Sequence, residues 1–287
     1  MSVIINSYLN KKIELKKHLK RFGLVFFDYK HDYDVWANEK LNNLKINKNE
    51  KEKYLSYLRM NNLKRDCYLD VNFYNLVAKH LDLSIILHSM KSKDILVSGY
   101  SACESLLDQT DILDLGCNAG YLSSFYSKLF SMSKVIGYDK SENSIKLAKK
   151  IYNRNIFKNL SFTCKFSTIK NKNFDYIIDT QCLSSLNSKS LNKTTLEIFD
   201  LLKNSGKLVT VSSLGNEIAT HNFINIFAKN NLYVEIMSEV LVNTIYGYKA
   251  YTKIVFSKDK NNHIIVLENY FNELRKKISL LKVFDAF

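Results

Sequence analysis

Apolar positions change their spacing along this chain, and the change separates a strand-rich region from helical regions on either side. Short apolar runs predict β-strands at 111–115, 134–138, 160–166, 174–179 and 206–212. Apolar residues at helical spacing follow these runs and predict α-helices at 120–131, 142–153, 190–203 and 216–230. A regular alternation of strands and helices is typical of an α/β fold with a mainly parallel sheet.

The flanking regions complete the predicted organisation. Residues 1–105 are expected to form a mainly helical cap, with helices at 2–22, 48–65 and 69–90 and an extended aromatic segment at 22–29. Residues 106–260 form the core, which closes with strands at 232–242 and 249–257. Residues 261–287 predict one C-terminal helix, whose apolar seam comprises Leu267, Phe271, Leu274, Ile278 and Leu281. Such a seam either docks on the core or pairs with a second subunit in a homodimer.

The strand at 111–115 runs into a glycine-containing turn. Gly116 and Gly120 allow the backbone to approach a ligand where a side chain would clash. The helix that follows directs free N–H groups toward the same place. The spacing differs from both G-x-G-x-x-G and the P-loop, and Tyr121 stands where a P-loop has lysine. The segment therefore predicts a ligand-binding βα unit of another kind.

This turn resembles motif I of the class I S-adenosylmethionine (SAM)-dependent methyltransferases, in which an acid opens a D-x-G-x-x-x-G turn; here the run is 114–120. Asp139 ends the next strand, where the family places the acid that binds the SAM ribose. The alternative for Asp139 is that it only caps the helix that begins near Ser141. Residues 173–180 and 206–212 resemble the family's fourth and fifth strands, although Ser205 replaces a glycine.

The resemblance covers roughly residues 105–257 and implies both a fold and a ligand. The implied fold is α/β, with a Rossmann-like, mainly parallel seven-stranded sheet, an antiparallel last strand and a helical N-terminal cap. The implied cofactor is SAM, with S-adenosylhomocysteine as its product. By resemblance, the cofactor-binding residues are Asp114, Gly116, Cys117, Asn118, Gly120, Asp139, Lys140, Phe166, Ser167, Asp179 and Thr180. Phe166 or Ser167 would meet the adenine, where family members often carry an acid that is missing here.

Methyl transfer needs a general base only when the acceptor loses a proton. The candidates are His18, His31, His88, His221, Tyr246, Tyr248 and Tyr251. His221 is selected because it follows the fifth predicted strand on the expected ligand side. The alternative is that it lies at the surface of the next helix. No metal site is predicted, since the five cysteines contain no C-x-x-C pair.

Charge and composition limit the classes of partner that we expect for this chain. The formal net charge is +14, but the chain has only five arginines and no arginine-rich block, which makes a nucleic-acid partner unlikely without excluding it. The chain contains no proline. Methyltransferases that modify exocyclic amines or cytosine C5 of DNA depend on proline-containing motifs, so both classes are disfavoured.

Scattered cysteines favour a reducing compartment. We find no run of about 18 apolar residues and no signal-peptide pattern, so a cytoplasmic protein without a membrane partner is expected.

The sequence thus predicts a SAM-dependent methyltransferase that acts at O or N of a small molecule or biosynthetic intermediate. Two alternatives stay open. One is an RNA or protein methyltransferase, and the other is an inactive member of the fold that serves as a binding partner.

Overall fold

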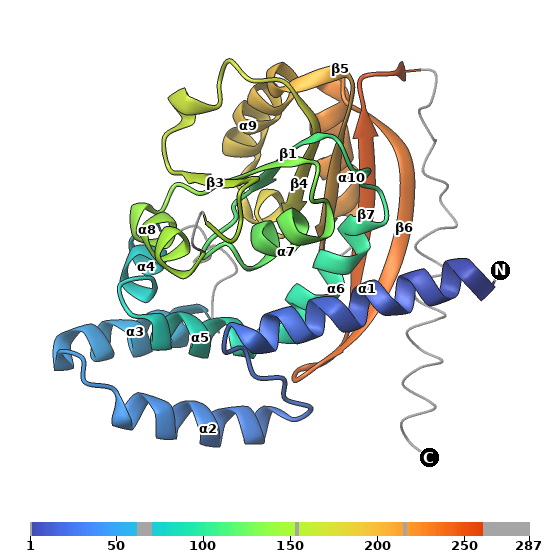
Figure 1. Ribbon diagram of the computed structural model, residues 1–287. Coiled ribbons are helices and arrows are strands. Elements are labelled where there is room, and N and C mark those ends of the chain that lie inside the picture. Colours follow the sequence, from blue (N-terminus) through green and yellow to red (C-terminus); the bar gives the residue numbers. More distant parts are fainter. Residues whose placement is uncertain (1, 62–70, 153–154, 215–216, 261–287) are drawn as a thin grey trace.

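The computed structural model describes residues 2–61, 71–152, 155–214 and 217–260. Its centre is one seven-stranded sheet in the order β3-β2-β1-β4-β5-β7-β6 (Figure 1). The strands are β1 Asp111–Leu115, β2 Lys134–Tyr138, β3 Leu160–Thr163, β4 Phe174–Thr180, β5 Leu202–Ser212, β6 Tyr233–Thr244 and β7 Gly247–Ser257. β1 to β5 are mutually parallel, and β7 runs antiparallel to both β5 and β6. The predicted fold class, including the antiparallel last strand, is confirmed.

The central strands are apolar because both of their faces are covered. Leu113 of β1 lies beside Ile136 of β2 and Ile177 of β4, and both Leu113 and Ile177 are fully buried. Continuous apolar runs are typical of parallel strands that helices cover on both sides. Because β2, β1 and β4 are adjacent and parallel, their carboxyl ends lie side by side at one end of the strands.

Helices form a layer on each face of the sheet (Figure 1). One layer holds α1 Ser2–Arg21, α6 Ser92–Cys103, α7 Tyr121–Leu129 and α8 Glu142–Ile151. The other holds α9 Ser188–Leu201 and α10 Glu217–Lys229. Leu15 and Leu19 of α1 and Val97 of α6 belong to the same apolar cluster as Ile112 of β1. The N-terminal region therefore contributes directly to the core of the sheet domain.

The remaining N-terminal helices share a second apolar cluster beside the sheet. They are α2 Lys30–Asn43, α3 Lys48–Asn61, α4 Val71–Val77 and α5 Leu81–Met90. Ile245, in the turn between β6 and β7, packs into this cluster. The β6–β7 hairpin thus touches the helical cap as well as the sheet.

Several predicted boundaries shift in the structure. The stretch 69–90 contains two helices, since α4 ends at Val77 and α5 begins at Leu81. α2 and α6 were not predicted: α2 is rich in charged residues and has a weak apolar pattern, while α6 carries buried serines between its apolar residues. β3 ends at Thr163, before a 3-10 turn at Phe166–Thr168. The predicted C-terminal helix and its dimer seam lie outside the described residues, and the domain boundaries stay predictions.

Among the described residues, none of the helices combines the length and the apolar character that crossing a lipid bilayer requires.

Candidate active site

The turn after β1 has a backbone conformation that strongly favours glycine. Gly116 has φ +73° and Gly120 has φ +80°. The N–H groups of Gly116 and Cys117 both donate to the Tyr138 carbonyl, at 2.8 and 3.0 Å, which ties the turn to the end of β2. A Cβ on Gly116 would lie 2.7 Å from the Cys182 side chain. The two glycines therefore let β1, β2 and the loop after β4 pack closely together.

Gly120 also meets a packing constraint that the sequence does not indicate. A Cβ there would lie 2.6 Å from the Phe162 ring of β3. Gly120 does not line the cavity described below, whereas Gly116 does. The space beside the Gly120 Cα is filled by Phe162, and the predicted contact of Gly120 with a ligand stays a prediction.

Asp139 lies just beyond β2 and holds two loops together. Its Oδ2 accepts the Asn118 N–H at 2.9 Å, and its Oδ1 accepts the Ser141 N–H at 2.8 Å. The Ser141 side chain in turn caps α8 by accepting the Ser144 N–H. Burial raises the pKa of Asp139, although both N–H groups oppose the rise. This half-buried carboxylate lines the cavity, so it is fixed in place with unused lone pairs available to a ligand.

Asp114 is more deeply placed. Its carboxylate is 1% exposed and accepts the Ser123 hydroxyl of α7. Burial raises the pKa of Asp114 to about 7, and the nearby Asp179 and Asp139 carboxylates add to the rise. Asp114 lines the cavity at the end of β1, where a cationic ligand would favour its ionised form.

Asp179 organises the loop after β4. Its Oδ1 accepts the N–H groups of Cys182 and Leu183, both at 2.9 Å, and its Oδ2 accepts the Thr210 hydroxyl at 2.9 Å. The side chain is completely buried, and burial raises its pKa to about 6. Asp179 does not line the cavity, but its neighbour Thr180 does. Its contacts are those of a residue that shapes the cavity wall from behind.

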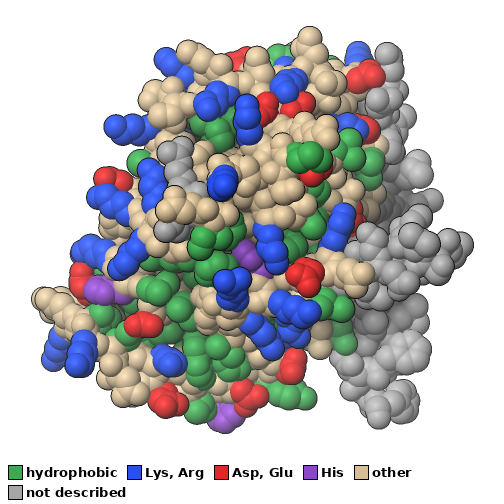
Figure 2. Space-filling model, in the orientation of Figure 1, with side chains coloured by type: hydrophobic (Ala, Val, Ile, Leu, Met, Phe, Trp, Pro, Cys, Tyr) green, Lys and Arg blue, Asp and Glu red, His purple; other side chains and the backbone are tan. Residues whose placement is uncertain are grey.

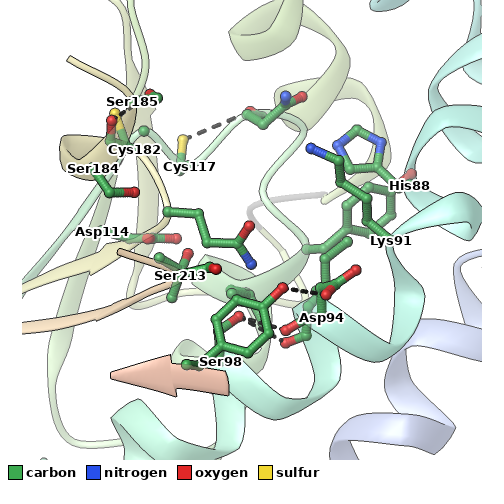
Figure 3. Close-up of a pocket in the computed structure, with 18 of the residues that line it drawn as sticks. His88, Lys91, Asp94, Ser98, Asp114, Cys117, Cys182, Ser184, Ser185 and Ser213 are labelled. Carbon is green, nitrogen blue, oxygen red and sulfur yellow. Dashed lines mark hydrogen bonds between the residues drawn. The ribbon is translucent and has the colours of Figure 1, made fainter. Parts of the chain in front are cut away.

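A cavity of about 590 Å³ lies at the carboxyl ends of β1, β2 and β4, and six of the predicted site residues line it. They are Asp114, Gly116, Cys117, Asn118, Asp139 and Thr180. Figure 3 shows Asp114, Cys117 and Cys182 on one side of this space and His88, Lys91 and Asp94 on the opposite side. A volume of this size is in the range of small-molecule and cofactor sites. We call the first side the strand-end wall and the second, formed by α5, α6 and β7, the cap wall.

Four other predicted residues do not line this cavity. Lys140 is exposed just after Asp139, and Ser167 is exposed in the 3-10 turn after β3. Phe166 is half-buried, with its ring centroid 6.1 Å from that of Tyr138. His221 is half-buried on α10, two residues after the cavity-lining Ala219. Nothing in the structure tests their predicted roles, which stay predictions.

The cap wall concentrates polar side chains that the sequence indicates only in part. His88 and Tyr251 were candidate bases, whereas Lys91, Asp94 and Lys249 were not singled out; all five line the cavity. The available signal was a set of polar residues spaced four apart on apolar helices, such as Ser84–His88 and Asp94–Ser98. Such polar positions on a helix face that otherwise packs against the core indicate a buried polar site.

His88 and Lys91 have altered proton affinities on this wall. The His88 Nδ1 lies 2.6 Å from the Ser84 carbonyl, so it donates this hydrogen bond and leaves Nε2 as an acceptor. Burial lowers the pKa of His88 to about 4, which keeps the ring neutral at neutral pH. Burial also lowers the pKa of Lys91 to about 8; Asp94 opposes this fall and Lys249 adds to it.

His18 is the remaining buried candidate base, but it belongs to the core. Its Nε2 lies 2.9 Å from the Ser124 hydroxyl of α7, and its ring packs on Phe22 and Phe125. Burial lowers the pKa of His18 to about 4. It does not line the cavity.

Comparison with known proteins gives a family match. A family model described as "Methyltransferase domain" matches residues 106–274, which is more than half of the chain. The "Putative methyltransferase 235L" of Invertebrate iridescent virus 6 is 28% identical over 125 residues, covering 40% of this chain and 44% of the viral protein. The aligned part thus spans less than half the length of that relative.

Solved structures give matches of lower identity. A TehB-like SAM-dependent methyltransferase from Corynebacterium glutamicum is 17% identical, with a TM-score of 0.47, over 60% of this chain and 97% of that chain. Magnesium protoporphyrin IX methyltransferase from Synechocystis with bound SAM is 15% identical, with a TM-score of 0.45, over 60% of this chain and 82% of that chain.

Proposed function

The chain belongs to the methyltransferase-domain family, and we propose that it transfers a methyl group from SAM to an oxygen or nitrogen atom of a small molecule. The observation that carries this proposal is the cavity at the carboxyl ends of β1 and β4, with the Asp139 carboxylate held on its strand-end wall. In the sheet, β2 and β3 lie on one side of β1, whereas β4 and β5 lie on its other side, so the strand order reverses at β1. Ligands of open α/β sheets bind at such a switch point.

The residues present fit an adenosyl cofactor that carries a positive charge. Asp139 is fixed by two backbone N–H groups and retains lone pairs for the hydroxyl groups of a ribose. Asp114 offers a buried acid to the cationic part of the ligand. Gly116 lines the cavity without a side chain, so the backbone of the turn borders the ligand space directly. When bound, SAM supplies an electrophilic methyl group on a sulfonium centre.

A small acceptor is supported by the composition of the cap wall. Leu87 and Ile95 of the cap wall and Leu122 of α7 line the cavity, so the cavity is bounded by helices and has an apolar side. In catalysis, the cap wall would hold the acceptor atom in line with the methyl group.

RNA or a protein as acceptor is the main alternative, because the net charge is +14. Figure 2 shows Lys and Arg side chains spread over the visible face and interspersed with acidic ones. A spread of this kind gives a weaker electrostatic footprint than a continuous basic stripe. Incorporation of labelled methyl groups into bulk tRNA or histones, with none into small molecules, would favour this alternative.

The test is calorimetric binding of SAM and S-adenosylhomocysteine, followed by Asp139→Ala. We expect wild-type binding and a loss of about 1–3 kcal/mol in the variant, the scale of a lost hydrogen bond to a charged group. Asp175→Ala is the matched control. Its carboxylate also accepts a backbone N–H, from Asp111 at 2.8 Å, but it lies at the opposite end of the sheet. The control should bind with wild-type affinity.

Two outcomes would overturn the proposal. A folded wild-type protein that binds neither SAM nor S-adenosylhomocysteine would indicate an inactive member of the fold. Equal losses in Asp139→Ala and Asp175→Ala would show that the effect comes from general destabilisation rather than from the proposed ribose contact.

A further inference from the structure

We propose that Tyr251 and Asp94 form the proton-accepting pair of this site, and that the methyl acceptor is therefore a hydroxyl group. This inference rests on the proposed methyl transfer. It selects oxygen over nitrogen as the acceptor atom and assigns the base to the cap wall instead of His221.

The pair is built from two distant parts of the chain. The Tyr251 hydroxyl of β7 donates a hydrogen bond to Asp94 Oδ1 of α6, across 157 residues of sequence. Tyr251 is 2% exposed and Asp94 is 4% exposed, and both line the cavity. Because the Tyr251 hydroxyl donates its proton to Asp94, its oxygen can act only as an acceptor toward a ligand hydroxyl.

The surroundings of Asp94 carry positive charge. Asp94 lies in the first turn of α6, where the helix dipole stabilises negative charge. The Lys91 ammonium is close enough for the two charges to interact, and Lys249 also acts on Lys91. Because Asp94 Oδ1 already accepts the Tyr251 hydrogen bond, it is the atom placed to take up the Tyr251 proton.

The proton movement balances in two linked transfers. As the acceptor oxygen forms its new bond to the methyl carbon, its proton passes to the Tyr251 oxygen, and the Tyr251 proton passes to Asp94 Oδ1. The electron pair of the broken carbon–sulfur bond stays on the sulfur of the leaving group. Tyr251 is the catalytic residue of this pair, and Asp94 acts through it as a positioning residue and final proton acceptor.

The cap wall next to the pair suits a hydroxyl carried on an apolar group. Leu87 and Ile95 line the same wall, and the Tyr121 ring packs on His88 with centroids 5.0 Å apart. These side chains offer contact area to an aromatic or aliphatic ring. A phenol is therefore a suitable probe of this subsite.

The experiment compares three probes of one shape, 4-methylphenol, 4-methylbenzenethiol and 4-methylaniline, with radiolabelled SAM. The phenol must lose its proton to the site, whereas the thiol ionises readily in water and needs no base. Tyr251→Phe should lower the rate for the phenol by about 100-fold or more, since general bases contribute on that scale. The rate for the thiol should fall less than about threefold, because the ring of Phe keeps the packing of Tyr251.

Binding supplies a readout that does not depend on turnover. In the presence of S-adenosylhomocysteine, Tyr251→Phe should weaken 4-methylphenol binding by roughly threefold to tenfold, the scale of one neutral hydrogen bond. It should leave binding of 4-methylanisole, which has no hydroxyl proton, unchanged. Tyr246→Phe is the matched control, since Tyr246 is 47% exposed and does not line the cavity.

Asp94 is tested by Asp94→Asn and Asp94→Glu. The amide accepts the Tyr251 hydrogen bond but cannot take up its proton, so Asp94→Asn should lower the phenol-to-thiol rate ratio as Tyr251→Phe does. Asp94→Glu restores a carboxylate and should recover part of that ratio. A residue with only a structural role would change both rates together and leave the ratio unchanged.

The inference fails separately from the proposed function. A protein that binds SAM but transfers no methyl to the phenol, or transfers it only to the aniline, overturns the assignment of a hydroxyl acceptor. Equal falls for phenol and thiol in Tyr251→Phe overturn the role of the pair. Failure to bind SAM at all refutes the methyltransferase proposal itself.

Discussion

The two walls of the cavity are built in different ways. The strand-end wall comes from short segments at the ends of β1, β2 and β4, and backbone N–H groups fix Asp139 on it and Asp179 behind it. The cap wall is assembled from α5, α6 and β7, and side chains such as Tyr251 and Asp94 join its parts. A wall fixed by backbone geometry suits a constant ligand, whereas one built from side chains can change with the acceptor. We therefore expect substitutions in the strand-end wall to affect cofactor binding and fold together, and those in the cap wall to affect the acceptor alone.

The largest effect should follow Gly120→Ala. The substitution adds a Cβ 2.6 Å from the Phe162 ring, at a residue with φ +80°. Left-handed strain and overpacking together should lower the free energy of unfolding by about 2–5 kcal/mol, measured by urea titration.

Gly247→Ala separates the two causes. Gly247 has φ +91° but no atom within 4 Å of the position of a Cβ, so only the strain of about 1–2 kcal/mol applies. Equal losses in the two variants would show that Phe162 yields and that the turn is not tightly packed.

Asp179→Ala should have the next largest effect. It leaves the N–H groups of Cys182 and Leu183 without their acceptor behind the strand-end wall, at a cost of about 2–4 kcal/mol in unfolding free energy. S-adenosylhomocysteine binding, measured by calorimetry, should weaken as well, because residues 180–182 line the cavity.

Asn187→Ala is its control. Asn187 caps α9 by accepting the Ser190 N–H at 2.9 Å, outside the cavity, and its loss should cost about 1 kcal/mol without changing ligand affinity. If Asp179→Ala lowered the free energy of unfolding as expected but kept full affinity for S-adenosylhomocysteine, the loop after β4 would not contribute to cofactor binding.

A change of one pH unit, acting through Asp114, should have a smaller effect than either of these substitutions. Its folded pKa of about 7 lies above the ordinary value of 3.8, so between these values the folded protein holds a proton that the unfolded chain has released. The free energy of unfolding should therefore fall as pH rises through this window, by at most about 1.4 kcal/mol per pH unit. The contribution is complete below the ordinary value and is lost above about pH 7. Asp114→Asn should remove this part of the slope in urea titrations across the window.

Ligand charge sharpens the same prediction. A cationic ligand favours ionised Asp114, so SAM binding near neutral pH should release protons, seen as buffer-dependent heats in calorimetry. S-adenosylhomocysteine lacks the sulfonium charge and should release fewer. Identical proton release by both ligands would place the sulfonium away from Asp114.

The sequence predicted the structure correctly where it depends on residues that are close together in the chain. The strands β1, β2 and β4 are short apolar runs, and the turn from Asp114 to Gly120 carries its own glycines and acid, so six residues of the cavity could be named. The close approach of Phe162 to Gly120 could not be predicted because Phe162 belongs to another strand.

The cap wall could not be predicted in the same way. The contact between Asp94 and Tyr251 joins residues 157 positions apart, and no local pattern in either segment encodes it. α2 escaped prediction because its charged residues obscure the apolar spacing that Tyr33, Ala37 and Leu41 provide. Buried polar residues on α6 interrupt its apolar pattern in a similar way.

The order of strands has a consequence for how the molecule is made. Among the described strands, β6 pairs with β7 alone, and β7 also pairs with the second edge of β5. On a ribosome, where chains emerge from their N-terminus and fold as they lengthen, the segments of the strand-end wall up to Cys182 are made 69 residues before the cap wall gains Tyr251. Nascent chains halted before residue 247 would therefore leave β6 unpaired, and the last hairpin to emerge would complete the reaction chamber.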